Sequence, residues 1–371
     1  MQSRALLLEI DVGAIRANAR AIKNAVGPKV ELFACLKGDA YGCGIRLVAP
    51  ALAAEGVRQF AVGAIDDALA IRRAGAQGEV LLYPNCLSSA ASTVESNDLT
   101  VTLNSIDEAA AWDAAAGGRI KAFIKVDVGA LRGGVMPREA SKLGAAVRRM
   151  SKVDIRGVYA HLHLPDPVRM RDHALHQLQA FDRAIQSIEA AGVPRGLRMI
   201  SGTAALLQYP EMDLDAVDPG RALFGLGFAG TTRDLRLQPA VRRWSSRLLL
   251  VKDVLPEDVA PYAAPFPLAE PRRIGVAPMG WGDGLPRQLP SDAHVLVRGQ
   301  RAPLLPPSHF EHIRIDLTGV PDAQYGDEVV ILGRQGGANV PLAEVAEWCG
   351  KDPLHFLGTL PRHIDRIAVG T

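Results

Sequence analysis

The chain has 371 residues, of which 48% are hydrophobic and 22% charged, and its formal net charge is +2. This balance is typical of a globular protein with a large apolar core, and the length indicates more than one domain. The near-neutral charge predicts no nucleic-acid partner, although a local site for a phosphate or a carboxylate stays open. No apolar run approaches the length of a membrane-spanning helix, so no membrane association is expected.

The first residues and the cysteines indicate a cytoplasmic protein. The apolar run near the start is too short for a signal peptide, and charged residues close it off. Cys35, Cys43, Cys86 and Cys349 form no CxxC pair and no disulfide-dense pattern. We therefore expect four reduced thiols and no metal site.

Short apolar, β-branched runs alternate with Ala- and Arg-rich helical stretches over the first two-thirds of the chain. These runs predict strands at residues 31–37, 59–64, 79–84, 99–104, 121–127, 155–162 and 197–202, with a weaker eighth at 217–224. Ser105 and Glu108 fit a capping box, in which the serine bonds a free N–H of the first helical turn and the glutamate reaches back. Eight strand–helix units predict an N-terminal (β/α)8 TIM-type barrel, with an open doubly wound sheet as the alternative.

The pattern changes after about residue 230. Residues 256–271 are rich in proline and alanine and are expected to form a loop. Strand-like runs follow at 274–277, 294–297, 312–317 and 328–332, and one helix fits Leu342–Cys349. We therefore predict a barrel over residues 1–230 and a mostly β C-terminal domain over residues 231–371, with residues 1–10 as candidates to join the second domain.

Lys37 closes the apolar run that begins at Glu31, where a barrel strand meets its top loop and barrel enzymes place their chemistry. Partial desolvation at this position is expected to lower the pKa of the lysine and to free its amine as a nucleophile. From position alone, a strand-end lysine that extends its ammonium group to solvent is the plainer interpretation.

The residues that follow Lys37 favour the nucleophile. The segment Lys37–Gly44 reads KGDAYGCG, which resembles the cofactor-lysine motif of the alanine racemase family, usually written VVKANAYGHG. The resemblance implies an enzyme that acts at the Cα of an amino acid with pyridoxal 5′-phosphate, held on Lys37 as a Schiff base, with Tyr41 bonded to the phosphate. It also implies a homodimer whose active site lies at the subunit interface.

The resemblance continues in order over about 350 residues. Lys125–Gly134 resembles KVDTGMGRLG, in which a lysine that can be carbamylated orients an arginine. The match implies that Lys125 orients Arg132, and that Arg132 contacts the cofactor phenolate and the substrate carboxylate, a task that suits a guanidinium. For Lys125, a salt bridge in the barrel interior is the plainer alternative. Tyr159–Leu162 resembles the family's THF motif and implies that His161 stacks on the cofactor ring; a core histidine is the alternative.

Two further segments imply a phosphate site. Ser201–Ala205 resembles NSAA, with Thr203 as the hydroxyl donor at a helix start. Pro219–Gly225 resembles PGIALYG and places Gly220 near the phosphate. In the second domain, the segment from Pro278 to Arg287 resembles PIGYADGYPR.

Two departures from the family pattern fall on its acid–base chemistry. The family's second acid/base, a tyrosine contributed by the partner subunit, is Trp281 here, and an indole N–H donates without offering a basic lone pair. The family's arginine that faces the pyridine nitrogen is Asp218 here. An aspartate there would stabilise a pyridinium, which is a stronger electron sink. The plainer alternative is that Asp218 bonds Arg221 or caps a turn.

A third departure lies where the family carries a CMD segment, which matches residues 309–311. Glu311 keeps the acidic group of that segment, and His309 and His312 add ionisable groups that titrate in the range needed of a base. Two exposed loop histidines are the alternative.

Three functional interpretations follow. The first is an amino-acid racemase whose second proton carrier is His309, His312, Glu311 or Cys43. The second is a one-base lyase, aldolase or decarboxylase on the same fold, which the replacements at Trp281 and Asp218 favour. The third is a cofactor carrier without turnover, against which the second domain argues.

Overall fold

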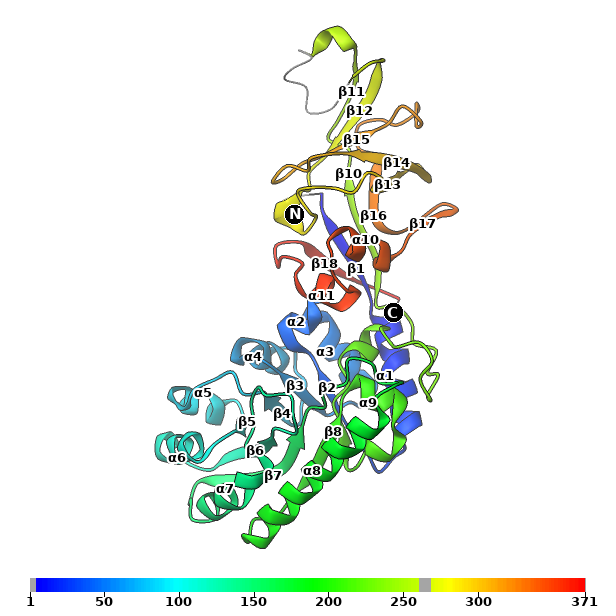
Figure 1. Ribbon diagram of the computed structural model, residues 1–371. Helices are drawn as coiled ribbons and strands as arrows, with labels where there is room; N and C mark the ends of the chain where they lie inside the picture. Colours follow the sequence, from blue (N-terminus) through cyan, green and yellow to red (C-terminus); the bar gives the residue numbers. More distant parts are fainter. Residues whose placement is uncertain (1–4, 260–267, 371) are drawn as a thin grey trace. The chain divides into compact units, whose positions relative to one another are not determined.

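The computed structural model describes residues 5–259 and 268–370 (Figure 1). The chain forms two compact units. The barrel unit comprises residues 13–40 and 44–238, and the β-rich unit comprises the residues up to Val12, Tyr41–Cys43 and those from Pro239 onward. No helix in the described ranges is long and apolar enough to cross a membrane.

The barrel unit is built on a closed cylinder of parallel strands. In chain order these are β2 (Glu31–Cys35), β3 (Gln59–Val62), β4 (Val80–Leu82), β5 (Leu99–Leu103), β6 (Ile120–Val126), β7 (Val153–Ala160), β8 (Leu197–Ser201) and β9 (Ala216–Val217). Strand β9 pairs with both β8 and β2, which closes the barrel. The predicted (β/α)8 class is confirmed, and the open doubly wound sheet is excluded.

Helices alternate with these strands and lie around them (Figure 1). They are α1 (Val12–Val26), α2 (Lys37–Tyr41), α3 (Ile45–Ala54), α4 (Ile65–Arg73), α5 (Ala91–Ser96), α6 (Ile106–Ala115), α7 (Ala140–Val147), α8 (Arg171–Ala190) and α9 (Thr203–Gln208). The longest, α8, buries Ala174, Phe181, Ala184 and Ile188, a spacing of three, four or seven residues that keeps one apolar face on the strands.

Two local predictions in the barrel need correction. The sequence predicts a strand over residues 217–224, but β9 ends at Val217 and Arg221–Phe224 forms a 3-10 helix. The reason is Pro219, which has no N–H to donate to a strand ladder. In the predicted capping box, Ser105 Oγ accepts from Glu108 N at 3.2 Å as expected. Glu108 Oε2, however, accepts from Asn104 N at 2.7 Å, one residue earlier than a capping box requires.

Aromatic side chains fill the barrel interior from strand to strand. The ring centroids of Phe33 and Phe123 are 5.8 Å apart, those of Phe123 and Tyr159 6.3 Å, and those of Tyr159 and Tyr83 5.9 Å. Gly157 makes room for this row, because a Cβ built there would lie 2.4 Å from Phe123 Cε1. All four aromatic residues are buried, so Tyr83 ends a row of closely packed rings.

The β-rich unit confirms the predicted mostly β second domain. Its described strands follow the order β11–β12–β15–β14–β13–β16–β10–β1–β18, with β17 paired to β16. They are β1 (Leu7–Asp11), β10 (Val241–Arg247), β11 (Leu250–Val254), β12 (Arg272–Ala277), β13 (His294–Val297), β14 (Gln300–Leu305), β15 (Ile313–Asp316), β16 (Glu328–Gln335), β17 (Ala338–Val340) and β18 (Asp365–Val369). Two helices, α10 (Leu342–Trp348) and α11 (Pro353–Gly358), accompany the sheet.

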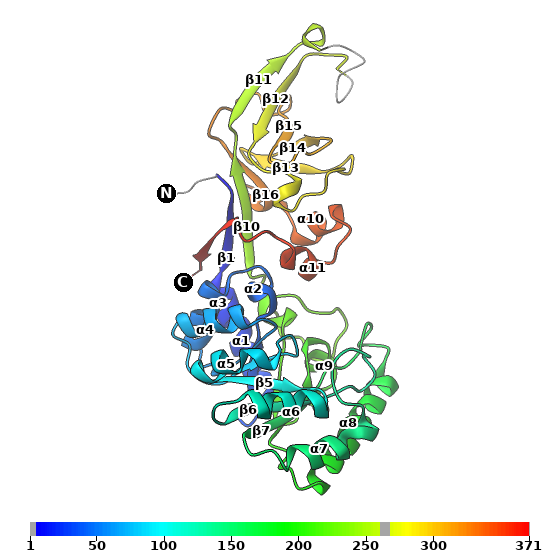
Figure 2. The ribbon, with the colours of Figure 1, turned by 90° about the vertical axis from the view of Figure 1, so that its left-hand side faces the viewer.

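The strand nearest the start of the chain belongs to this sheet. Strand β1 pairs antiparallel with β10 and parallel with β18 (Figure 2). The sequence does not predict β10, because in VRRWSSR arginines and serines interrupt the apolar alternation that marks a strand. Residues 260–267 of the predicted loop lie outside the described residues.

Candidate active site

The backbone after Lys37 makes a left-handed turn. From Gly38 to Tyr41 the φ angles are 58°, 57°, 58° and 52°. Non-glycine residues adopt this conformation at a cost of about 1–2 kcal/mol each, so the turn needs support. Asp39 supplies it, because its Oδ1 accepts from Ile45 N at 2.8 Å and its N–H donates to Asp67 Oδ2 at 3.3 Å. The strained turn fixes the direction in which Lys37 leaves the end of β2.

Three cations gather where the barrel strands end. Lys37 follows β2, Lys125 is the penultimate residue of β6, and Arg132 lies in the loop after β6. Within residues 5–259 and 268–370, none of the three makes an ion pair. Burial, followed by the charges of Arg132 and Lys37, lowers the pKa of Lys125 to about 8. Cations that repel one another in this way favour an anionic ligand. The salt bridge suggested as the plainer role of Lys125 is not formed.

Tyr83 lies against Lys37 and bonds Asp218. The centroid of its ring is 4.5 Å from Lys37 Nζ, and its hydroxyl donates to Asp218 Oδ2 at 2.7 Å. Burial, followed by the charge of Asp218, raises the pKa of Tyr83 well above its usual range, so the phenol keeps its proton. The sequence analysis does not single out Tyr83. The available signal was its place directly after β4, the same kind of strand-end position that marks Lys37 after β2.

Asp218 follows β9 and is 7% exposed. Burial raises its pKa, while the Tyr83 hydroxyl, Lys37 and Lys125 oppose that rise. Its Oδ1 is buried and has no hydrogen-bond partner among the described residues. The sequence alone suggests Arg221 or a turn as the plain partner of this carboxylate, whereas the structure shows Tyr83.

His161 follows β7 and borders the same space as Asp218. A Cβ built at Gly202 would lie 3.6 Å from His161 Cε1 and 3.7 Å from Asp218 Oδ1. Burial lowers the pKa of His161 to about 4, and the charges of Lys37, Arg132 and Lys125 act in the same direction. The imidazole is therefore neutral at neutral pH.

The two segments expected to bind phosphate meet in the structure. Thr203 begins α9, is buried, and accepts from Ala222 N through Oγ1 at 3.2 Å. Because the oxygen is the acceptor in this bond, the hydroxyl proton remains available to a ligand. Gly220 lies two residues before Ala222 and is also buried. A hydroxyl and the Gly220 loop thus share one side of the barrel mouth.

Trp281 and Glu311 lie on adjacent loops of the β-rich unit. Trp281 N donates to His309 O at 2.9 Å, and the Trp281 and Phe310 rings meet edge to face at 4.4 Å. Trp281 is 44% exposed, and His309, Glu311 and His312 are exposed as well. The structure therefore brings the candidate bases of residues 309–312 to the loop that carries Trp281.

The Trp281 loop is held by a buried aspartate. Asp283 Oδ2 accepts from Gly280 N at 2.9 Å, and Asp283 Oδ1 lies 2.7 Å from His363 Nε2. Two further candidate residues also belong to this unit. Tyr41, the last residue of the left-handed turn, is half-buried, and Cys43 is fully buried. A thiol without solvent access is poorly placed to exchange protons.

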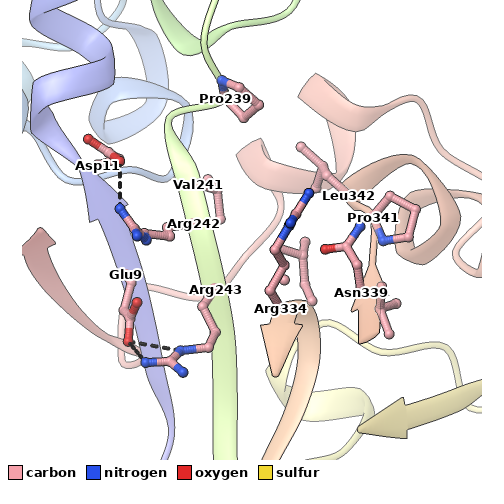
Figure 3. A pocket seen from close by; sticks show the side chains of 13 residues that line it. Glu9, Asp11, Pro239, Val241, Arg242, Arg243, Arg334, Asn339, Pro341 and Leu342 are labelled. Atoms are coloured by element: carbon pink, nitrogen blue, oxygen red, sulfur yellow. Dashed lines mark hydrogen bonds and ion pairs between the residues drawn. The ribbon is translucent and has the colours of Figure 1, made fainter. Parts of the chain in front are cut away.

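The β-rich unit also contains a hollow of about 620 Å³ (Figure 3). Its wall includes Glu9, Asp11, Arg242, Arg243 and Arg334. Arg243 Nε donates to Glu9 Oε1 at 3.0 Å, and Arg242 Nη1 donates to Asp11 Oδ2 at 3.3 Å. These ion pairs neutralise two of its arginines, in contrast to Lys37, Lys125 and Arg132, and no predicted site residue lines the hollow.

Comparison with known proteins relates both units to one family. The model described as "Alanine racemase, N-terminal domain" matches residues 10–227, and "Alanine racemase, C-terminal domain" matches residues 241–368. An alanine racemase of Desulfovibrio desulfuricans is 33% identical over 99% of this chain and 98% of its own length. One of Halothermothrix orenii is 30% identical over 91% of this chain and 90% of its own.

Solved structures agree with these sequence matches. The alanine racemase of Bacillus anthracis, with bound L-Ala-P, has a TM-score of 0.90 at 25% identity and covers 99% of this chain and 96% of that one. The enzyme from a D-cycloserine-producing Streptomyces lavendulae has a TM-score of 0.85 at 26% identity and covers 100% of this chain and 98% of that one. The family models, the identities and the shared fold show that this chain belongs to the alanine racemase family of pyridoxal-phosphate-dependent isomerases.

Proposed function

We propose that the barrel mouth holds pyridoxal 5′-phosphate and that the chain racemises an amino acid there. The observation that carries this proposal is the primary amine of Lys37 at a strand end, beside two further cations, Lys125 and Arg132, that make no ion pair within the described ranges. The residues fit the cofactor. It brings a phosphate dianion, an aldehyde and an aromatic ring, and the site offers cations, a primary amine and the neutral face of His161.

Each residue has a task that its chemistry allows. When bound, the cofactor supplies an electron sink for the electron pair of the Cα–H bond. Lys37 would hold the cofactor through its aldehyde carbon, and once the amino group of the substrate has replaced it there, its freed amine would move a proton at Cα on its own face of the substrate. Arg132 binds the substrate carboxylate through its two-pronged guanidinium, and Lys125 orients Arg132. His161 covers the ring.

The phosphate is assigned to three groups, of which Thr203 and the Gly220 loop belong to the barrel unit and Tyr41 to the β-rich unit. The Thr203 hydroxyl, the backbone N–H groups of the Gly220 loop and the Tyr41 hydroxyl would each donate a hydrogen bond to a phosphate oxygen. The support for Thr203 is that its Oγ1 already accepts a hydrogen bond from Ala222 N, so its hydroxyl hydrogen can be donated to the phosphate.

Racemisation needs a second proton carrier on the opposite face of the substrate. Trp281 cannot fill this role, because its indole nitrogen has no basic lone pair. The adjacent loop carries the exposed imidazoles of His309 and His312, which can take up and release a proton, and the carboxylate of Glu311. We place the second carrier on this loop and infer a homodimer in which the loop of one subunit completes the site of the other.

The four free cysteines are consistent with a cytoplasmic location.

The reaction is tested in deuterated water. L-alanine and D-alanine are the first substrates to use, because the curated relatives are named alanine racemase. Deuterium incorporation at Cα with inversion of configuration is expected from either enantiomer. Incorporation with retention, or release of carbon dioxide or an aldehyde, would instead support a one-base enzyme. No exchange with any amino acid would leave a cofactor carrier.

The shared site is tested by subunit complementation. Lys37→Ala removes the barrel amine, and the triple variant His309→Gln, Glu311→Gln and His312→Gln removes the loop bases, so each homodimer should be inactive. Mixing the two under conditions that exchange subunits should restore about one intact site per heterodimer. Activity that stays at the level of the separate variants would show that the loop does not act across subunits.

A further inference from the structure

We propose that Asp218, held in place by the hydroxyl of Tyr83, hydrogen-bonds the ring nitrogen of the bound cofactor and keeps that nitrogen protonated. This inference rests on the proposed function, because it requires the cofactor to be bound at Lys37. Asp218 would touch the cofactor directly, whereas Tyr83 is a positioning residue that acts through Asp218. The family pattern, with an arginine facing this nitrogen, implies the opposite protonation state.

The hydrogen bonds of Asp218 leave one acceptor unused. Its side chain is 93% buried, since 7% is exposed, and Oδ2 accepts from Tyr83 at 2.7 Å. Oδ1 has no partner among the described residues. A buried carboxylate oxygen without a donor is costly, and native proteins rarely leave one unless a ligand or water supplies the missing hydrogen.

The position of Oδ1 points to the ring as that ligand. A Cβ at Gly202 would lie within 3.7 Å of Oδ1 and within 3.6 Å of the His161 ring, so glycine leaves open the space that the two groups border. Tyr83 spans from Lys37 Nζ to Asp218, with its ring at the amine and its hydroxyl at the carboxylate. In the cofactor, the aldehyde carbon and the ring nitrogen lie at opposite ends of the ring. A cofactor joined to Lys37 therefore directs its nitrogen away from the amine, towards the carboxylate.

The negative charge of the Asp218 carboxylate favours the protonated form of the cofactor's ring nitrogen. The Tyr83 hydroxyl stays protonated and donates a hydrogen bond to Oδ2, which stabilises the ionised form of Asp218. Burial raises the pKa of Asp218, whereas Lys37 and Lys125 favour its ionised form. The ionised carboxylate only accepts hydrogen bonds, so its partner on Oδ1 must be a donor, which a protonated ring nitrogen provides. The proton comes from water when the cofactor binds, and the pyridinium N–H then donates to Oδ1.

A protonated ring withdraws electrons more strongly and stabilises a carbanion at Cα for longer. The α-proton then has time to exchange with solvent before a proton returns to Cα from either face. This links Asp218 to the replacement at Trp281, since a weaker second proton carrier needs a longer-lived carbanion.

The protonation state of the ring nitrogen can be measured directly by NMR. The holoprotein is prepared with cofactor carrying ¹⁵N in the ring, and its ¹⁵N chemical shift is recorded for the unaltered chain and for Asp218→Asn, Tyr83→Phe and Tyr159→Phe. We expect a pyridinium shift in the unaltered chain, an unprotonated shift in Asp218→Asn and a partial move in Tyr83→Phe. Tyr159→Phe is the matched control, because this buried phenol bonds Thr102 at 3.0 Å instead of Asp218. It should keep the pyridinium shift.

The outcomes separate this inference from the proposed function. An unprotonated nitrogen in the unaltered holoprotein, or an unchanged shift in Asp218→Asn, overturns the role of Asp218 while leaving the cofactor site intact. Equal shifts in Tyr83→Phe and Tyr159→Phe remove the positioning role of Tyr83. Failure of the unaltered chain to form an imine absorbance band with the cofactor would instead refute the proposed function itself. If Asp218→Asn does not fold, Asp218→Glu, which keeps the acid but displaces it, should still change the shift.

Discussion

Lys37 Nζ lies 4.5 Å from the centroid of the Tyr83 ring, and the hydroxyl of the same tyrosine bonds Asp218 at 2.7 Å. One buried side chain thus contacts both the amine and the carboxylate of the candidate site. An ammonium group over an aromatic face gains about 0.5–2 kcal/mol, so the ring helps to hold Lys37 in one direction before any ligand arrives. The row of rings from Phe33 to Tyr83 makes this contact rigid.

Lys37→Ala should abolish the imine absorbance near ~420 nm expected of the bound cofactor. The variant removes the only atom to which we assign the covalent link, so the cofactor should be lost on gel filtration. The matched control is Lys142→Ala, whose side chain is 70% exposed and pairs with Glu139 on the surface. A band that persists in Lys37→Ala would remove the central assignment.

Trp281→Tyr should raise the rate of racemisation. The substitution places a phenol, which can release and take up a proton, on the loop where the indole can only donate. The change suits the position, because the Trp281 side chain is 44% exposed and rests edge-on against Phe310. Trp281→Phe is the control that changes size without adding a proton carrier. Chiral chromatography of the products measures both, and equal rates in the two variants would indicate that another group already serves this face.

Acidification should destabilise the cofactor-free chain through His161. Burial, then Lys37, Arg132 and Lys125, lower the pKa of this histidine from 6.5 to about 4. Between these values the unfolded state binds a proton that the folded state does not, so the free energy of unfolding falls as the pH falls through this window. Denaturant titrations at pH 7 and pH 5 measure the loss. His161→Gln should lose this part of the pH dependence; the same dependence in both proteins would contradict the half-buried, neutral imidazole.

Gly42→Ala should lower the melting temperature more than Gly38→Ala. Both glycines have positive φ, 81° and 58°, so each alanine pays backbone strain of about 1–3 kcal/mol. A Cβ at Gly42 would in addition lie 2.2 Å from the backbone oxygen of Leu357, whereas a Cβ at Gly38 meets nothing within 4 Å. Differential scanning calorimetry gives the two melting temperatures. Equal shifts would show that the α11 backbone yields to the new methyl group.

Much of the barrel follows from local sequence. Seven of the predicted barrel strands lie within two residues of the observed ones, because apolar runs bounded by turn residues report burial directly. The order of strands along the chain also places Lys37, Lys125 and His161 at or near strand ends, and parallel strands bring those ends to one rim of the barrel. The resemblance to the family assigned their roles, and those assignments stay predictions.

Which side chains contact one another was decided by the tertiary structure alone. Tyr83 and Asp218 are 135 residues apart, and nothing in either neighbourhood predicts their bond, which exists because β9 closes the barrel against β2 and β8. The same holds for the β-rich unit, where the polar strand β10 becomes a strand only through its ladders to β1 and β16. The sequence by itself determined which residues carry reactive groups and which segments are buried, since both depend on local composition. Only the folded chain decided which of those groups face one another, because contacts across a closed barrel depend on register and packing far along the chain.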